Sequence, residues 1–231
     1  MSTRHAPWIA VAFVSIATAS LMLLPRILAL VPATNSDLLI RYQGIAWIVA
    51  LPLTVLTFSL HRKIAWRYFR LDRFAGAMEP VRWLGVGPGQ DWKRQGWQIS
   101  LVITLVTGIV VFLQVQPRVL ATKSILAVLP LACALAASNS LVEELIFRHT
   151  VVTFFDAHAW RRHAPIVSGL LFGAAHFSGV PGGFAGVLMA GFLGWLLTKS
   201  MQETGGLFWA WAIHFVLDVI IFTALLLRGF A

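Results

Sequence analysis

The chain has 231 residues, of which 58% are hydrophobic and 12% are charged, with a formal net charge of +9. A soluble domain carries about 25% charged residues, so this composition excludes an ordinary soluble protein and is typical of an integral membrane protein. The basic residues gather in a few loops, as membrane topology signals do, and we expect no nucleic-acid partner. The single cysteine, Cys133, excludes an intrachain disulfide and a cysteine metal cluster.

Long apolar runs predict an all-α fold, a polytopic transmembrane helical bundle, because a spanning helix needs roughly 20 apolar residues. We expect seven membrane helices, at about 7–31, 43–60, 99–115, 125–155, 165–176, 184–198 and 207–227. A break of the fourth at 138–140 would make eight. The first is expected to remain uncleaved, because its apolar run exceeds the core of a signal peptide, which is about 7–15 residues. Asn35-Ser36-Asp37, before the second helix, is typical of a turn.

The longest polar stretch, 61–98, mixes basic residues with tryptophans. This mixture predicts an amphipathic segment that lies on an anionic membrane surface. Lys and Arg are most frequent at the N-terminus and in 61–98, 156–164 and 199–206, which predicts that these parts are cytoplasmic. The Gly-rich run at 85–89 indicates a plain turn, because it lacks the strand and the lysine of a phosphate-binding loop.

One predicted helix carries two adjacent carboxylates and an arginine within an apolar run. A charge at the centre of a membrane helix costs at least about 2.5–3.5 kcal/mol, so these residues indicate a function or a compensating partner. Glu144 and Arg148 are four residues apart and can pair. Glu143 is rotated by about 100° from Glu144 and remains the freer carboxylate. Asn139 and Ser140 lie one turn earlier and can hydrogen-bond to the two glutamates.

Two later helices carry histidines at helical spacing. Phe172 and His176 are four residues apart, as are His214 and Asp218, where the carboxylate can fix the tautomer of the imidazole. At 1.5 Å per residue from the predicted cytoplasmic helix ends, Glu143 and His176 lie roughly 18 Å deep and His214 roughly 12 Å deep. These depths agree to about one helical turn, which predicts a single polar site inside the bilayer.

Such a site can hydrolyse a peptide bond within the membrane. Glu143 would be the general base for a water molecule that His176 helps to hold, and His214 would donate a hydrogen bond to the oxyanion. Alternatively, Glu143, His176 and His214 can bind a divalent metal such as zinc. The spacing is not His-Glu-x-x-His, so the usual zinc-protease geometry is absent, but the residues alone leave both alternatives open.

Three motifs therefore follow one another on successive hydrophobic helices: Glu143-Glu144-x-x-x-Arg148, Phe172-x-x-x-His176 and His214-x-x-x-Asp218. Together with Thr204-Gly205-Gly206-Leu207 and the tryptophan before His214, they resemble the CAAX prenyl protease and bacteriocin-processing (CPBP, or Abi) family of intramembrane proteases. The resemblance covers about 129–222. It implies a catalytic core at 121–231, preceded at 1–120 by N-terminal helices with the basic loop, all within one compact membrane domain.

The resemblance also implies roles for the site residues. Glu143 and His176 would activate the water, while His214 and Asp218 would stabilise the oxyanion. The remaining motif residues would support the site, and these are Glu144, Arg148, Asn139 and Phe172. Asp218 stands where eukaryotic members usually have Asn, and an ionised Asp would repel an oxyanion, so it would orient His214 or be protonated. His149 stands where many members have Gly. The glutamic mechanism, without a cofactor, is favoured over the zinc one.

We thus expect an intramembrane endopeptidase of the bacterial inner membrane, with a cytoplasmic N-terminus. Its partners would be a membrane-associated peptide or protein substrate and the lipid bilayer, and prenylated substrates are not expected in that setting. Two other functions stay open. One is a non-catalytic immunity or binding protein of the same family. The other is a proton-coupled carrier with Glu143 and His176 as a relay, which predicts inverted repeats that the sequence does not show.

Overall fold

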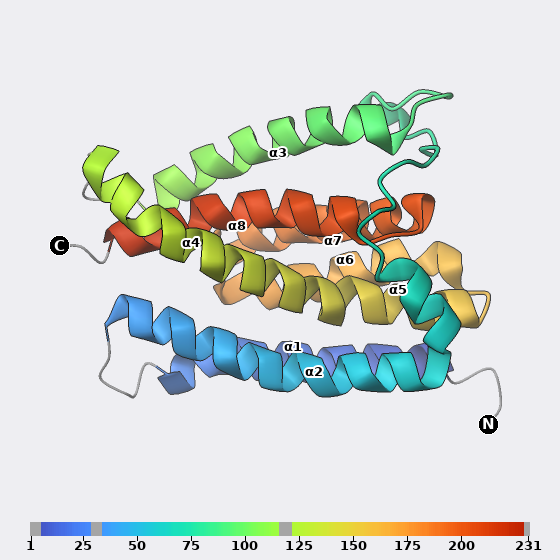
Figure 1. Ribbon diagram of the computed structural model, residues 1–231, viewed down its shortest axis with the longest axis horizontal. Coiled ribbons are helices and arrows are strands. Elements are labelled where there is room, and N and C mark those ends of the chain that lie inside the picture. The colour runs from blue at the N-terminus through green and yellow to red at the C-terminus, as the bar shows by residue number, and fades with distance from the viewer. Residues whose placement is uncertain (1–5, 29–33, 116–121, 229–231) are drawn as a thin grey trace.

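The computed structural model describes residues 6–28, 34–115 and 122–228 as a bundle of helices (Figure 1). The long helices are α1 (Ala6–Leu28), α2 (Asn35–Tyr68), α3 (Trp92–Val115), α4 (Thr122–Glu143), α5 (Thr150–Ala157), α6 (Ala164–Ala175), α7 (Gly183–Thr204) and α8 (Phe208–Arg228). Helices α1 and α2 form one side of the bundle, α3 forms the opposite side, and α4, α6, α7 and α8 lie between them. The predicted all-α bundle is confirmed.

Five segments of the described residues are long and apolar enough to cross a membrane. They are 36–68, 92–115, 124–157, 183–204 and 208–228. Helix α1 carries a shorter apolar stretch, Pro7–Leu23. The predicted end of the first helix at residue 31 and the predicted side of the N-terminus fall outside the described residues.

Helix α2 begins eight residues earlier than the apolar pattern predicted, so the turn predicted at 35–37 is wrong. Thr34 and Asp37 form a capping box at its start. The Thr34 hydroxyl accepts a hydrogen bond from the Asp37 backbone N–H at 3.2 Å, and the Asp37 carboxylate accepts one from the Thr34 N–H at 3.4 Å. These bonds satisfy two N–H groups of the first turn, which allows a polar segment to be helical.

The fourth predicted helix does not break at 138–140. It runs through α4 and α5, and the two are joined by one turn of π-helix, η2 (Glu144–His149). The Thr150 hydroxyl donates to the Leu145 carbonyl, five residues back, at 2.9 Å. A π turn inside an α-helix is frequently found at a functional site. Here it contains Glu144 and Arg148, so the motif with the two glutamates coincides with the irregular turn.

The polar stretch 61–98 is not one surface segment. Its first eight residues belong to α2, after a kink at His61, and its last seven belong to α3. The remainder, 69–91, crosses one end of the bundle from α2 to α3 (Figure 1). The α5–α6 and α7–α8 connections lie at that same end, so the basic loops predicted to share one side do lie together.

Residues 69–91, here called the crossing loop, are fixed to the end of α7 by polar contacts. Lys199 binds Glu79 at 2.6 Å and Glu203 at 2.5 Å. Glu203 also accepts hydrogen bonds from the Trp92 indole at 2.6 Å and from the Glu79 backbone N–H at 3.1 Å. The bond to Lys199 lowers the pKa of the Glu79 carboxyl. The crossing loop is therefore held at a set position over the end of α7 and α8.

Helices α6 and α7 touch backbone to backbone because glycines line both of them. A Cβ atom at Gly169 would lie 2.8 Å from the Gly191 carbonyl oxygen, and one at Gly173 would lie 2.7 Å from the Val187 carbonyl oxygen. Small residues allow this close approach between membrane helices. The contact sets the position of the Phe172–His176 turn against α7.

Candidate active site

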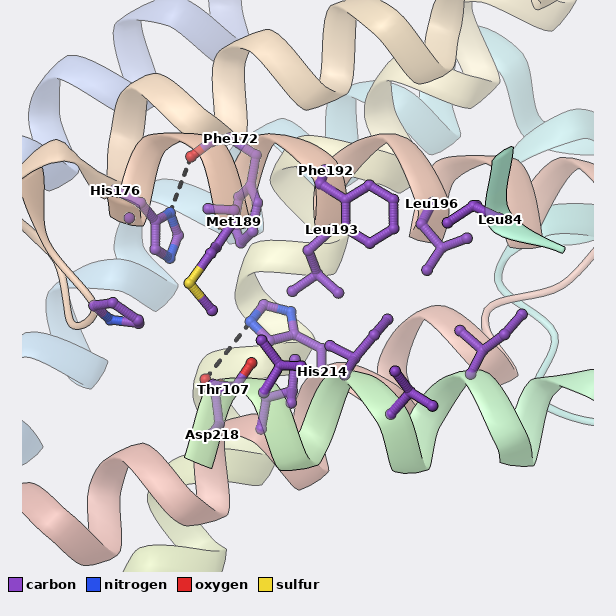
Figure 2. A pocket seen from close by; sticks show the side chains of 18 of the residues that line it. Leu84, Thr107, Phe172, His176, Met189, Phe192, Leu193, Leu196, His214 and Asp218 are labelled. Carbon is purple, nitrogen blue, oxygen red and sulfur yellow. Dashed lines mark hydrogen bonds and ion pairs between the residues drawn. The ribbon is translucent and has the colours of Figure 1, made fainter. Parts of the chain in front are cut away.

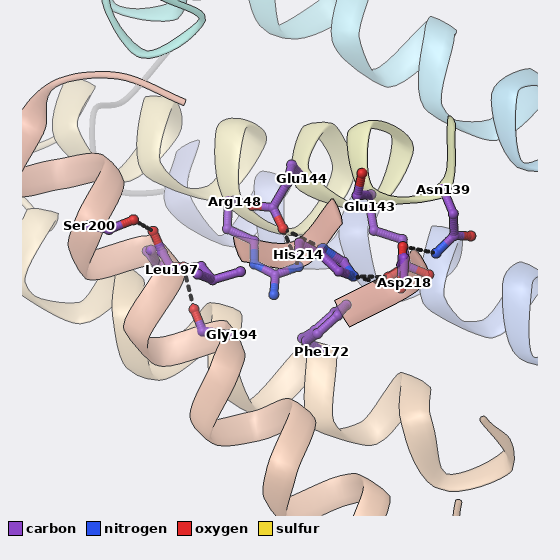
Figure 3. A network of polar contacts seen from close by, with 12 residues as sticks. Asn139, Glu143, Glu144, Arg148, Phe172, Gly194, Leu197, Ser200, His214 and Asp218 are labelled. Atoms are coloured by element: carbon purple, nitrogen blue, oxygen red, sulfur yellow. Dashed lines mark hydrogen bonds and ion pairs between the residues drawn. The ribbon is translucent and has the colours of Figure 1, made fainter. Parts of the chain in front are cut away.

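His214 of α8 is the centre of a buried polar cluster between α4 and α8 (Figure 3). Its Nδ1 lies 2.7 Å from Glu144 Oε1. Its Nε2 lies 3.4 Å from Glu143 Oε2 and 3.6 Å from Asp218 Oδ1. All four side chains are buried. The imidazole is thus surrounded by three carboxylates, two from α4–η2 and one from its own helix.

Glu144, and not Asp218, makes the contact that orients His214. A carboxylate oxygen at Nδ1 fixes the proton on that nitrogen, so Nδ1–H donates to Glu144 and Nε2 faces the other two carboxylates. The sequence assigned this orienting role to Asp218 because of the four-residue spacing. That spacing places Asp218 on the Nε2 side of the ring instead.

Arg148 compensates the charge of Glu144 inside the bundle. Its Nη1 lies 3.3 Å from Glu144 Oε1, and both side chains are fully buried. The predicted Glu144–Arg148 pair is therefore present. The guanidinium also lies 3.7 Å from the centroid of the Phe172 ring, in a cation–π contact that is stronger where water is excluded. Phe172 of α6 is connected in this way to the cluster on α4 and α8.

His176 lies apart from this cluster. It follows the last residue of α6, and its Nδ1 is 2.9 Å from the Phe172 backbone carbonyl. Because a carbonyl only accepts, Nδ1 is the donor and Nε2 is left as an acceptor in the neutral ring. The centroid of its ring lies 4.2 Å from that of Phe172, and the Phe172 centroid lies 5.6 Å from that of His214. Among the described residues, His176 makes no direct hydrogen bond to Glu143, His214 or Asp218.

A cavity of about 470 Å³ joins the two histidines (Figure 2). It lies between α3, α6, α7, α8 and residues 84–90 of the crossing loop. His176, His214 and Asp218 line it, whereas Glu143 contacts His214 without lining it. The rest of the wall is mainly apolar, with α3 and α7 contributing Ile99, Val102, Ile103, Val106, Met189, Phe192, Leu193 and Leu196. An apolar cavity with a few converging polar groups is typical of a ligand site.

A chain of hydrogen bonds from α2 also reaches the site, and the sequence did not predict it. The Gln43 amide donates to Asn139 Oδ1 at 3.0 Å, and the Asn139 amide donates to Asp218 Oδ2 at 3.1 Å. Ser138 donates to Gln43 Oε1 at 2.8 Å and accepts from the Trp47 indole at 2.9 Å. Asn139 therefore positions Asp218, not the glutamates. The one sequence signal for this chain of bonds was the Gln43 amide, which stands at the start of an apolar run.

Replacing Gln43 with Leu is expected to lower the free energy of unfolding by about 1–3 kcal/mol, because buried polar groups of Asn139 and Ser138 would lose their partner. Trp47→Phe removes only the outermost bond and is expected to cost about 0.5–1.5 kcal/mol. Denaturant unfolding of the purified chain in micelles measures both values. A larger loss for Trp47→Phe than for Gln43→Leu would show that the chain of bonds does not converge on Asp218.

The predicted zinc ligands do not come together as a metal site. No group of three or more His, Cys, Asp or Glu side chains in the described residues is arranged to hold a metal ion. His214 uses Nδ1 for Glu144, and His176 uses Nδ1 for the Phe172 carbonyl.

Residues 123–220 match the family model described as Rce1-like, type II CAAX prenyl endopeptidase Rce1-like. This part of the chain is an Rce1-like domain. The match confirms the resemblance predicted at about 129–222. The Rce1-like family is a protease family, and with the apolar helices it identifies an integral membrane protein. Neither the curated proteins nor the solved structures contain a match to the chain.

The Rce1-like domain begins in α4 and ends within α8. It contains all three motifs and the Thr204-Gly205-Gly206-Leu207 turn. It does not contain α2, which supplies Gln43, or α3, which supplies one wall of the cavity. The site is therefore built from the matched segment and from helices that precede it.

Proposed function

We propose that the Rce1-like domain is an intramembrane endopeptidase that hydrolyses a peptide bond with a water molecule activated by Glu143. The observation that carries this proposal is His214, held by Glu144 at Nδ1, with Nε2 beside Glu143 and Asp218 and with its ring at the wall of an apolar cavity. A general base, an oxyanion donor and a binding cavity for an apolar chain are then close together.

In the proposed reaction, Glu143 accepts a proton from the water while the water oxygen forms a bond to the scissile carbonyl carbon. Glu143 Oε2 is buried and accepts no hydrogen bond from the described residues, so it is available as the base. His176 Nε2 accepts the second water hydrogen, since Nδ1 is already a donor to Phe172. The C–N bond then breaks, and Glu143 returns its proton to the leaving amine.

His214 carries the oxyanion role in this scheme. A doubly protonated ring donates from Nδ1 to Glu144 and from Nε2 to the negative oxygen that develops on the substrate. The oxyanion replaces one of the two carboxylates, Glu143 or Asp218, that lie near Nε2 when no substrate is bound. Asp218, held by Asn139 at 3.1 Å, faces the same Nε2 at 3.6 Å before the substrate binds.

We propose that the substrate enters from the bilayer, as a membrane-associated peptide or protein in the bacterial inner membrane. The apolar walls from α3 and α7 support this route, because they suit an apolar chain better than a polar one. The family description names prenyl endopeptidases. For this chain we propose apolar peptide segments without a prenyl group as the substrate class. The mainly apolar side chains that line the cavity can contact such segments.

The test uses the full chain reconstituted in liposomes with a panel of membrane-spanning peptides, and mass spectrometry identifies the products. We expect cleavage that persists with a chelator and that falls on the order of 10²–10⁴-fold in His176→Ala. His163→Ala, at the other end of α6, is the matched control and should retain the wild-type rate. Cleavage at the wild-type rate by His176→Ala would refute the role of His176. Loss of cleavage on chelation, with recovery on zinc, would show a metal mechanism instead.

A further inference from the structure

A second cavity, of about 270 Å³, lies at the end of the bundle where the crossing loop runs. Arg67, at the end of α2, and Arg70 and Arg73, in the crossing loop, line it together with Thr204 and Gly205. It is distinct from the cavity of the candidate active site, whose walls contain none of these residues. The reaction proposed above gives these arginines no role.

Local contacts restrain two of the arginines. The Arg67 guanidinium lies 5.5 Å from the centroid of the Tyr68 ring. That ring is fixed in turn, because its hydroxyl donates to Asp156 at 2.7 Å. Arg70 forms a two-point contact with Asp72 through Nε and Nη2. A restrained guanidinium loses less conformational entropy when it binds a ligand.

The Thr204-Gly205-Gly206-Leu207 turn contributes Thr204 and Gly205 to the lining of this cavity. The Leu207 N–H donates to the Arg70 carbonyl at 2.8 Å. A Cβ at Gly206 would lie 2.5 Å from Arg73 Cβ, so only glycine permits this close approach. Gly205 has φ +70°, the left-handed conformation that ends α7. The turn thus holds the Arg70–Arg73 backbone directly above the α7–α8 connection.

Exposed apolar side chains are the sequence neighbours of the three arginines. Trp66 is 54% exposed, Leu71 50% and Phe74 40%. Tryptophan and aliphatic side chains interleaved with arginine are typical of the boundary between lipid tails and headgroups. The basic cavity therefore lies where the phosphates of a membrane would be within reach.

We propose that Arg67, Arg70 and Arg73 form a binding site for a phosphate group, supplied by an anionic phospholipid headgroup or by free phosphate. Guanidinium groups bind phosphate oxygens through paired hydrogen bonds. Arg67 and Arg73 provide such donors, and Arg70 keeps Nη1 outside its contact with Asp72. Basic pockets at the cytoplasmic ends of membrane helices bind lipid headgroups in this way. The site is independent of the proposed hydrolysis and can be tested without a substrate.

The experiment measures the thermal stability of the full chain in detergent during titration with phosphatidylglycerol, phosphatidylcholine or inorganic phosphate. We expect phosphatidylglycerol to raise the melting temperature more than phosphatidylcholine does. Arg67→Gln/Arg70→Gln/Arg73→Gln should raise the half-saturating concentration on the order of a hundredfold. The control, Arg62→Gln/Arg82→Gln/Arg94→Gln, removes the same charge from exposed arginines outside the cavity and should behave as the wild type.

Arg67→Gln alone leaves the Arg70–Asp72 contact in place, so it reports on binding even if the triple variant is poorly folded. We expect it to weaken binding on the order of fivefold. A response to inorganic phosphate equal to that of phosphatidylglycerol would identify free phosphate as the ligand. Equal losses in the triple variant and its control would overturn the proposal, as would the absence of any response to both phosphate sources.

Discussion

Glu143→Gln is expected to lower the rate of peptide hydrolysis on the order of 10²–10⁴-fold and to leave the fold intact. The amide has nearly the same shape as the carboxylate but cannot accept a proton from water. Glu143 makes its one close charged contact with His214, at 3.4 Å, and its Oε2 accepts no hydrogen bond within the described chain. The loss should therefore lie in catalysis, measured as kcat/KM in liposomes, with an unchanged melting temperature.

Glu144→Gln provides the comparison, because Glu144, unlike Glu143, has a structural role. Glu144 is the partner of both Arg148 and His214, so its neutralisation removes the carboxylate that contacts the buried arginine. This variant should lose stability as well as activity, whereas Glu143→Gln should lose activity alone. The roles of the two glutamates would be assigned wrongly if Glu143→Gln unfolded the protein or retained its activity.

Arg148→Met is expected to lower the free energy of unfolding by about 3–5 kcal/mol. The side chain is fully buried, and its removal leaves the Glu144 carboxylate without its cation in a low-dielectric interior. It also removes the cation–π contact with Phe172 at 3.7 Å. The measurement is denaturant unfolding in mixed micelles, followed by the intrinsic fluorescence of the tryptophans.

The double variant Glu144→Gln/Arg148→Met tests whether charge is the cause. It removes both members of the pair, so it should recover part of the stability that Arg148→Met loses, as replacements of whole buried pairs do. A double variant that is as unstable as the sum of the two single variants would indicate loss of packing. The source of the cost would then be the shape of Arg148 and not its charge.

The sequence predicted the motif helices well because their polar residues lie in long apolar runs. Glu143, Glu144 and His214 meet across α4 and α8, as equal depth suggested. Depth could not predict direction around a helix axis, so the contact between the rings of His176 and Phe172, with centroids 4.2 Å apart, was not foreseen. The roles of these residues in catalysis stay predictions until the variants are measured.

Other features carried too little signal to be predicted. Hydropathy does not mark a capping box in a polar segment, so the start of α2 at Thr34 was missed. A π turn has no pattern of its own, and η2 became visible only in the structure. The contacts of Gln43 and Trp92 are long-range, and a single amide or indole in the sequence does not reveal its partner.

The walls of the candidate active-site cavity come from two separate parts of the chain. The imidazoles and the carboxylate that line it come from α8 and from the turn after α6, inside the Rce1-like domain, as does the apolar wall of α7. A second apolar wall and one end come from α3 and residues 84–90, outside that domain. Substitutions at Val102, Ile103 or Leu84 would change the shape offered to a substrate without altering any carboxylate or imidazole. The residues outside the domain thus shape part of the cavity without contributing any of its ionisable side chains.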